Sequence, residues 1–211
     1  MDEYLIPTGD ADAEFVEKKS RFIGHVFRVE TEEEALAHLK RMRETYWDAS
    51  HNVYAYIIRG GTTRYSDDGE PGGTAGMPVL DVFRRGEIYN VCCVVTRYFG
   101  GTLLGTGGLV HAYGRAAKLA LEAAGVSRKQ VWARLDIPCP YGLYEQVKKE
   151  AAACGGLIER MDFGAAVDLS ILFPAAEAEG FRRRLTDLSG GRVAAADGGE
   201  EYRDFPVSPA L

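Results

Sequence analysis

The sequence has few cysteines, and their spacing fits neither a disulfide framework nor a metal site. The four are Cys92, Cys93, Cys139 and Cys154, with no Cys-x-x-Cys pair among 211 residues. Cys92 and Cys93 are adjacent in an expected strand, so their side chains point to opposite faces. This usage excludes a small disulfide-stapled secreted protein and favours buried thiols in a reducing cytoplasm.

Long apolar runs and a secretion signal are also missing. No stretch approaches the roughly 20 apolar residues of a membrane helix. The first residues contain no basic segment followed by an apolar core. We therefore expect a cytoplasmic protein without membrane contact.

The net charge is −6, and acidic residues outnumber basic ones on both sides of residue 126. The chain thus lacks the overall basic charge of many nucleic-acid-binding modules, although a local basic patch is compatible with this average.

The standard nucleotide and metal signatures are absent, but a glycine-rich stretch is present. Walker A, G-x-G-x-x-G, H-E-x-x-H and EF-hand patterns do not occur. This glycine loop follows the apolar run Val91–Val95 and opens a helical pattern over Thr106–Ala124; its glycines are Gly100, Gly101, Gly105, Gly107 and Gly108. Backbone N–H groups at a helix N-terminus attract anions, so this pattern predicts a site for phosphate or another anion. A purely structural use of the glycines, in tight turns and close packing, is the alternative.

The predicted anion-binding surface combines this loop with the polar face of the helix. We expect positive φ at Gly107 and Gly108, which β-branched residues tolerate poorly. The helix has an apolar stripe and an opposite face with basic residues. The expected stripe is Leu109, Ala112, Ala116, Leu119 and Ala123. The predicted anion-binding residues are Arg97, Gly100, Gly101, Gly105, Gly107, Gly108, His111, Arg115 and Lys118.

A second loop, Ser66–Thr74, contains Asp67, Asp68 and Glu70. Three carboxylates so close together repel one another unless cations or N–H donors meet them. Three interpretations compete: a structural network of turns and caps that pairs with Arg97, a site for Mg²⁺ or an activated water, and a binding surface. We expect this acidic loop to lie beside the glycine loop.

The remaining pattern predicts an α+β protein with two domains, residues 1–126 and 127–211. The first half should contain strands over Phe15–Val29, Asn52–Arg59 and Ile88–Tyr98, and helices over Thr31–Tyr46, Ala75–Arg85 and Thr106–Ala124. Residues 126–129 should form the junction. The second half follows a βαββαβ order, which is typical of a ferredoxin-like fold. Its elements are expected at Val131–Pro138, Tyr141–Cys154, Leu157–Phe163, Ala166–Phe173, Ala175–Leu188 and Arg192–Ala196.

Two long blocks resemble the Impact family, in particular its bacterial YigZ-like members. The blocks are Tyr65–Pro78 and Val95–Tyr113, and His51-Asn52 with Ala55-Tyr56 fits the same pattern. The resemblance implies a first domain like domain 2 of ribosomal protein S5 and a ferredoxin-like second domain. It also implies a role near translation. The eukaryotic relatives act in translational control through an additional N-terminal domain that this sequence does not contain.

Two positions depart from the family's pattern. The family often has Lys where Leu103 stands and Arg where His111 stands, so two cations are missing beside the glycine loop. Each missing phosphate contact would weaken nucleic-acid binding and reduce its salt dependence.

The leading hypothesis is a translation-associated accessory protein without catalysis or cofactor. It would bind RNA, the ribosome or another phosphate-bearing partner through the two loops, with exposed arginines beside aromatic residues such as Tyr98 or Tyr113. One alternative is a small-molecule enzyme that uses the glycine loop for phosphate and Asp67, Asp68 or Glu70 for metal or base. A protein–protein adaptor is the other.

Overall fold

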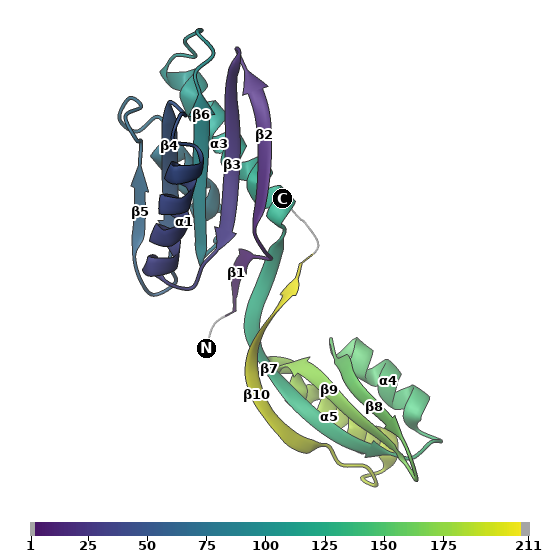
Figure 1. The fold of residues 1–211 in the computed structure, drawn as a ribbon. Helices are drawn as coiled ribbons and strands as arrows, with labels where there is room; N and C mark the ends of the chain where they lie inside the picture. The colour runs from purple at the N-terminus through teal and green to yellow at the C-terminus, as the bar shows by residue number, and fades with distance from the viewer. Residues whose placement is uncertain (1–2, 208–211) are drawn as a thin grey trace. The chain divides into compact units, whose positions relative to one another are not determined.

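The computed structural model describes residues 3–207, which form two compact units. One unit comprises Tyr4–Arg128 together with residues 205–207, and the other comprises Glu3 and Lys129–Asp204. Each unit combines helices with antiparallel strands (Figure 1), so the predicted α+β class is confirmed. No helix among the described residues is long and apolar enough to cross a membrane.

The first unit is built around an antiparallel sheet with strand order β2-β3-β6-β4-β5. Figure 1 shows α1 on one side of this sheet and α3 on the other. The strands are β2 (Ala11–Glu17), β3 (Ser20–Arg28), β4 (His51–Ile57), β5 (Thr63–Ser66) and β6 (Val91–Tyr98), and a short β1 covers Tyr4–Pro7. The helices are α1 (Glu32–Thr45), α2 (Gly76–Arg85) and α3 (Thr106–Ala124).

The central strand β6 explains the apolar run seen in the sequence. Helices cover both faces of the sheet, so every residue from Val91 to Arg97 is buried. Alternation along the strand sends Cys93 into the core under α2 and α3, and Cys92 into the core under α1. Adjacent cysteines therefore face opposite sides, and the chemistry of a thiol pair is not available to them.

Helix α1 begins where the sequence predicts a helix, and the start is held by a capping box, the pattern in which Thr31 and Glu34 each bond to the other's backbone, with one difference. Thr31 is the N-cap, and its Oγ1 accepts the N–H of Glu34 at 3.2 Å. The carboxylate of Glu34 accepts the N–H of Glu30 at 2.6 Å rather than that of Thr31. The second hydrogen bond of the capping box, in which the Glu34 side chain reaches back along the chain, is thus made one residue earlier than usual. The Thr31 side chain still accepts a backbone N–H of the first turn.

Helix α3 has the predicted bounds but a broader buried face. Leu119 is only half-buried and Ala123 is exposed, so these two stripe assignments were wrong. The buried residues are Leu109, Ala112, Tyr113, Ala116, Ala117, Ala120 and Leu121. Small side chains let the helix backbone approach the sheet: a Cβ placed on Gly24 of β3 would lie 2.4 Å from the carbonyl oxygen of Ala116.

The second unit has the predicted βαββαβ order. Its elements are β7 (Val126–Cys139), α4 (Tyr144–Ala153), β8 (Leu157–Phe163), β9 (Val167–Pro174), α5 (Ala175–Ser189) and β10 (Ala196–Pro206). In the sheet, β7 lies between β1 and β9, β8 follows β9, and β10 also pairs with β7. The core packs α4 and α5 against the inner face of β7 and β9.

Two strand positions differ from the sequence expectation. β7 begins at Val126, so the residues expected as a junction are extended, and the division between the units at 128/129 falls inside this strand. The last strand covers Ala196–Pro206 instead of Arg192–Ala196, because the chain first turns through Gly190 and Gly191, both at positive φ.

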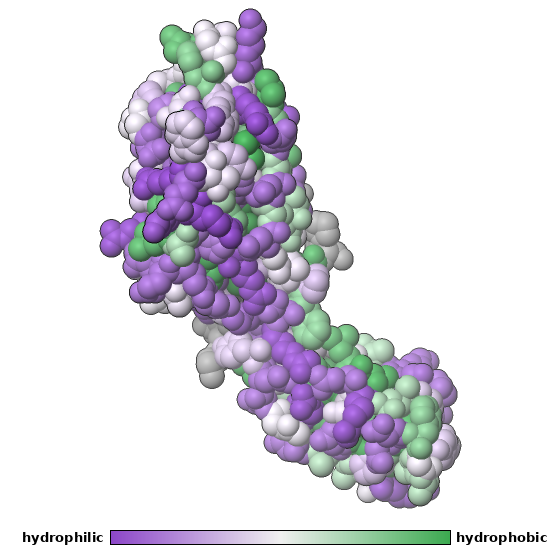
Figure 2. All heavy atoms as spheres, in the orientation of Figure 1, coloured by the Kyte–Doolittle hydropathy of each residue, from purple (hydrophilic) through white to green (hydrophobic). Residues whose placement is uncertain are grey.

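The strand β8 is exposed along its whole length. It lies at the end of its sheet and presents Leu157, Ile158, Met161 and Phe163 to solvent. In Figure 2 hydrophobic side chains gather over the part of the second unit where Figure 1 places β8 and α4. This edge is an apolar feature that the periodicity of the sequence does not reveal.

The close approach of α3 to β3 predicts that Gly24→Ala destabilises the first unit. The new Cβ would meet the backbone of Ala116, which cannot rotate away, so we expect a loss of about 1–3 kcal/mol in the free energy of unfolding. Gly107→Ala is the control, because its Cβ would point into open space. Urea unfolding followed by circular dichroism measures both variants. Equal midpoints for Gly24→Ala and the wild-type protein would contradict the proposed packing constraint.

Candidate functional site

The acidic loop holds the start of α2 through Asp67. Its Oδ1 accepts the N–H groups of Ala75 at 3.0 Å and Gly76 at 2.8 Å, and its Oδ2 accepts that of Gly73 at 2.9 Å. The residue before α2 supplies no side-chain cap of its own. Asp67 therefore caps this helix from a distance, and both its oxygens are occupied.

Asp68 ties the same loop to β4. It takes positive φ (47°), and its Oδ2 accepts the N–H of Asn52 at 2.7 Å. Its Oδ1 receives Arg43 at 3.2 Å, and its carbonyl accepts His51 Nδ1–H at 2.8 Å. These contacts give Asp68 a structural role in the loop. Within residues 3–207, no three His, Cys, Asp or Glu side chains gather so that they could hold a metal ion.

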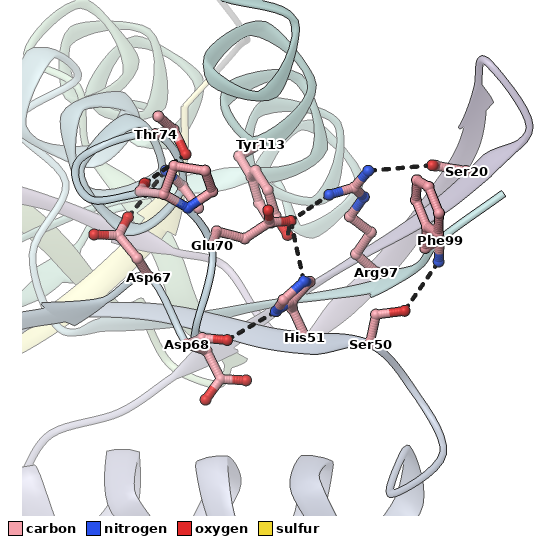
Figure 3. Close-up of polar contacts among 12 residues, drawn as sticks. Ser20, Ser50, His51, Asp67, Asp68, Glu70, Thr74, Arg97, Phe99 and Tyr113 are labelled. Atoms are coloured by element: carbon pink, nitrogen blue, oxygen red, sulfur yellow. Dashed lines mark hydrogen bonds and ion pairs between the residues drawn. The ribbon is translucent and has the colours of Figure 1, made fainter. Parts of the chain in front are cut away.

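Glu70 lies at the centre of a buried charged cluster (Figure 3). Arg97 Nη1 donates to its Oε1 at 2.5 Å and the Tyr113 hydroxyl donates at 2.7 Å, while His51 Nε2 lies 3.7 Å away. The Glu70 and Arg97 side chains are 4% and 5% exposed. Burial, together with the hydrogen bond to Glu70, raises the pKa of Tyr113 far above its ordinary value. The phenol therefore stays a neutral donor.

Arg97 joins the acidic loop to the glycine loop. Its Nη2 donates to Ser20 Oγ at 3.4 Å, and the same Oγ accepts the N–H of Gly100 at 3.2 Å. The two loops thus lie together, with Arg97 between them. The sequence had predicted Arg97 on the anion-binding surface. Its side chain is instead buried and paired with Glu70, so Arg97 lies beneath the surface.

The glycines of the second loop serve different purposes. A Cβ on Gly100 would lie 2.0 Å from the backbone of Lys19, so this position permits a close approach of two chain segments. Gly101 and Gly105 take positive φ, at 83° and 76°. Gly107 and Gly108 do not, because both lie inside the first turn of α3, and the prediction of positive φ there was wrong.

The exposed face of α3 forms one wall of a groove, which we call the α2–α3 groove. From α3 it is lined by His111, Arg115 and Lys118, and from α2 by Arg85 and Asp81. Its volume is about 800 Å³. Arg115 also lies 4.4 Å from the centre of the Phe15 ring and 4.0 Å from Glu17. The three predicted basic residues of the helix therefore share one concave surface.

A second cavity lies at the N-terminus of α3, and we call it the His51 pocket. Its polar lining includes His51, Glu70 and Arg97, and its apolar lining includes Phe99 and Leu103. Its volume is about 420 Å³. An enzyme built on the acidic loop would need a carboxylate that is free to act in a cavity. Of the loop's three carboxylates, Glu70 alone lines this cavity, and its Oε1 already accepts hydrogen bonds from Arg97 and Tyr113.

Comparison with known proteins decides the family. The model of the Impact N-terminal domain matches residues 18–121, and that of a domain of unknown function, DUF1949, matches residues 137–192. The IMPACT family member YvyE of Bacillus subtilis is 33% identical over 99% of this chain and 97% of its own. YigZ of Escherichia coli is 35% identical over 92% and 97%. The chain belongs to the IMPACT family.

Solved structures agree with this assignment to the IMPACT family. A crystal structure described as that of a hypothetical protein is 34% identical, with a TM-score of 0.59 over 92% of this chain and 97% of that one. The family resemblance seen in Tyr65–Pro78 and Val95–Tyr113 is therefore confirmed, and so is the α+β fold that it implied.

Sequence reasoning missed two residues of this IMPACT family member. Arg85 was taken only as the end of a helix. The basic pair Arg84-Arg85 in the last turn of α2 is the signal in the sequence that could have indicated a basic surface. His51 was noted only as part of the family's pattern and was not assigned to the site. Its contact with Glu70 depends on how β4 and β6 pair, with His51 opposite Arg97, and a single sequence does not show this pairing.

The buried cluster predicts strong coupling between Glu70 and Arg97. Glu70→Gln and Arg97→Met each leave one buried charge without its partner, so each should cost about 3–5 kcal/mol of unfolding free energy. The double variant removes both charges and should cost less than the sum, by about 0.5–3 kcal/mol. A double-mutant cycle in urea tests this, with Tyr113→Phe as a milder control that removes one hydrogen bond. Additive effects would contradict a direct ion pair.

Proposed function

We propose that this protein is a translation-associated accessory factor that binds structured RNA or the ribosome through the α2–α3 groove. The observation that carries the proposal is the convergence of His111, Arg115, Lys118 and Arg85 on one concave surface of a protein whose net charge is −6. Local basic surfaces attract polyanions whatever the average charge of the molecule. The role of the eukaryotic IMPACT relatives in translational control supports this setting.

The chemistry of the groove favours contacts with phosphate over the reading of bases. Its lining within residues 3–207 contains no Phe, Tyr or Trp, and Tyr113, which we had expected at such a surface, is completely buried. Base stacking on single strands needs exposed aromatic rings. We therefore expect affinity that depends weakly on sequence and strongly on salt, since counterions are released when cations meet phosphates.

The acidic loop holds α2 and α3, the two walls of the groove, in place. Asp67 holds the start of α2, and Glu70 contacts Tyr113 of α3, so the loop sets the positions of both groove walls. The acids thus need not touch the anionic partner, which they would repel. The four cysteines are free and buried, which is compatible with the cytoplasmic location that we propose.

Removal of single groove cations should weaken RNA binding and its salt dependence. Lys118→Ala should lower the slope of log K against log salt by about one. Arg115→Met should do the same while an apolar side chain still covers Phe15. Lys40→Ala is a matched control: Lys40 lies on α1 and pairs with Glu44 at i,i+4, as Lys118 pairs with Glu122.

The measurement is fluorescence anisotropy with labelled ribosomal RNA, or ribosome co-sedimentation, over a series of KCl concentrations. Circular dichroism verifies that the variants fold. Loss of binding in Lys40→Ala equal to that in Lys118→Ala would show that the groove is not the interface. Absence of any salt-dependent binding to RNA or ribosomes would refute the proposed function.

Restoring the family's usual cations should have the opposite effect. His111 is exposed in the groove and Leu103 is 82% exposed, so Arg and Lys fit at these positions without repacking. His111→Arg should tighten RNA binding and steepen the salt slope by about one; Leu103 lies outside the groove, beside the glycine loop, so adding Leu103→Lys should steepen it again where the RNA extends past the start of α3. The same anisotropy series measures this. A slope unchanged in both variants would place the RNA elsewhere.

A further inference from the structure

Two charged side chains that line the His51 pocket, Glu70 and Arg97, each keep one atom without a partner among the described residues. The contacts of the Glu70 carboxylate within the described residues all involve Oε1, so Oε2 is left to accept a hydrogen bond. The Nε of Arg97 is buried and unpartnered. Both side chains are more than nine-tenths buried, and both line the cavity. Buried polar groups are normally satisfied, so the Nε of Arg97 is an exception, and the Oε2 of Glu70 is open to a ligand or water.

His51 is oriented toward the same cavity. Its Nδ1–H donates to the Asp68 carbonyl at 2.8 Å, which fixes the ring and leaves Nε2 as the free nitrogen. Nε2 lies 3.7 Å from Glu70 Oε1, and the side chain is 23% exposed. Figure 3 shows the ring between Asp68 and Glu70. A hydroxyl or amino group in the pocket could therefore donate to Glu70 or His51.

The opposite end of the pocket is suited to an anion. Gly105 is the N-cap of α3 and has no side chain to accept the first N–H groups, and the first turn contains no acid. Leu109 N–H is the first to bond within the helix, to the Gly105 carbonyl. The earlier N–H groups, beginning at Thr106, thus have no intrahelical acceptor. Gly105 and Thr106 both line the pocket.

We propose that the His51 pocket binds a small organic acid, either a carboxylate or a phosphate ester, that also carries a hydroxyl group. The acid accepts hydrogen bonds from the N-terminus of α3, and the hydroxyl donates to Glu70 Oε2 or His51 Nε2. Phe99 and Leu103 cover the apolar part of the ligand. The paired charges of Glu70 and Arg97 leave the pocket without net repulsion of an anion. A volume of about 420 Å³ lies within the range of small-molecule sites.

Ligand pairs test the hydroxyl without changing the protein. The probes are isovalerate and 2-hydroxyisovalerate for the carboxylate, and ethyl phosphate and 2-hydroxyethyl phosphate for the phosphate ester. Backbone amide NMR of the full chain should show shifts at Gly105 and Thr106. The hydroxylated member of the better pair should bind on the order of tenfold more tightly, because its hydroxyl reaches a charged acceptor. The pair that binds more tightly identifies the acidic group.

One substitution tests the helix terminus. Thr106 is the first residue of α3, where proline is well tolerated and removes only the N–H. Gly105 has ψ 164°, which suits a residue before proline. Thr106→Pro should weaken binding of the better probe on the order of tenfold, while Thr106→Ala, which keeps the N–H, should bind like the wild type.

A second pair of variants separates binding from stability. Gly107 has open space around it and lacks positive φ, so Gly107→Glu places a carboxylate at the helix start without strain. This should raise the melting temperature and abolish probe binding, whereas Gly107→Gln should affect binding far less.

The proposal is overturned if no probe shifts Gly105 or Thr106, if hydroxylated and plain probes bind equally, or if Thr106→Pro binds like Thr106→Ala. Lys118→Ala should leave probe binding unchanged, since Lys118 does not line this pocket. Failure of the RNA proposal and failure of this one are therefore separate results.

Discussion

The buried ion pair between Glu70 and Arg97 is the interaction on which the candidate site depends. Arg97 lies in the central strand β6, Glu70 in the acidic loop, and Tyr113, which also donates to Glu70, in α3. Through Ser20 the same arginine reaches β3 and the glycine loop. A buried charge is tolerable only if it is paired. The pair therefore couples the positions of both loops to the sheet beneath them.

Close backbone packing then decides where α3 lies. Gly24 lets the helix rest on β3, and Gly100 lets the glycine loop pass Lys19 at a distance that excludes any Cβ. The loop ends at Gly105, whose positive φ directs the chain into the helix. The glycines of this loop thus act first through geometry. Any anion binding at the helix start is a consequence of where that geometry places the N–H groups.

Two surfaces of α3 have become distinct in the structure. The N-terminus of the helix opens into the His51 pocket, and its exposed face lines the α2–α3 groove. The pocket is small and largely apolar, and it contains the Oε2 of Glu70, which makes no hydrogen bond within the part of the chain that the structure describes, so it suits a small hydroxylated acid. The groove brings together Arg85, Arg115 and Lys118 and, among the described residues, contains no Phe, Tyr or Trp, which suits a phosphate backbone. One helix can therefore present two anion-recognising features to partners of different size.

The sequence by itself determined the local features of this protein. The bounds of α3 and β8 and the capping role of Thr31 follow from periodicity and short-range hydrogen bonding, and the motifs around Tyr65–Pro78 and Val95–Tyr113 revealed the family. Tertiary structure alone decided which groups meet. The pairing of β4 with β6 brings His51 to Glu70, the packing of two helices brings Arg85 to Lys118, and the register of the helix start moves positive φ from Gly107 to Gly105. Local patterns arise from neighbours in the chain, whereas these contacts join residues whose proximity only the folded backbone creates.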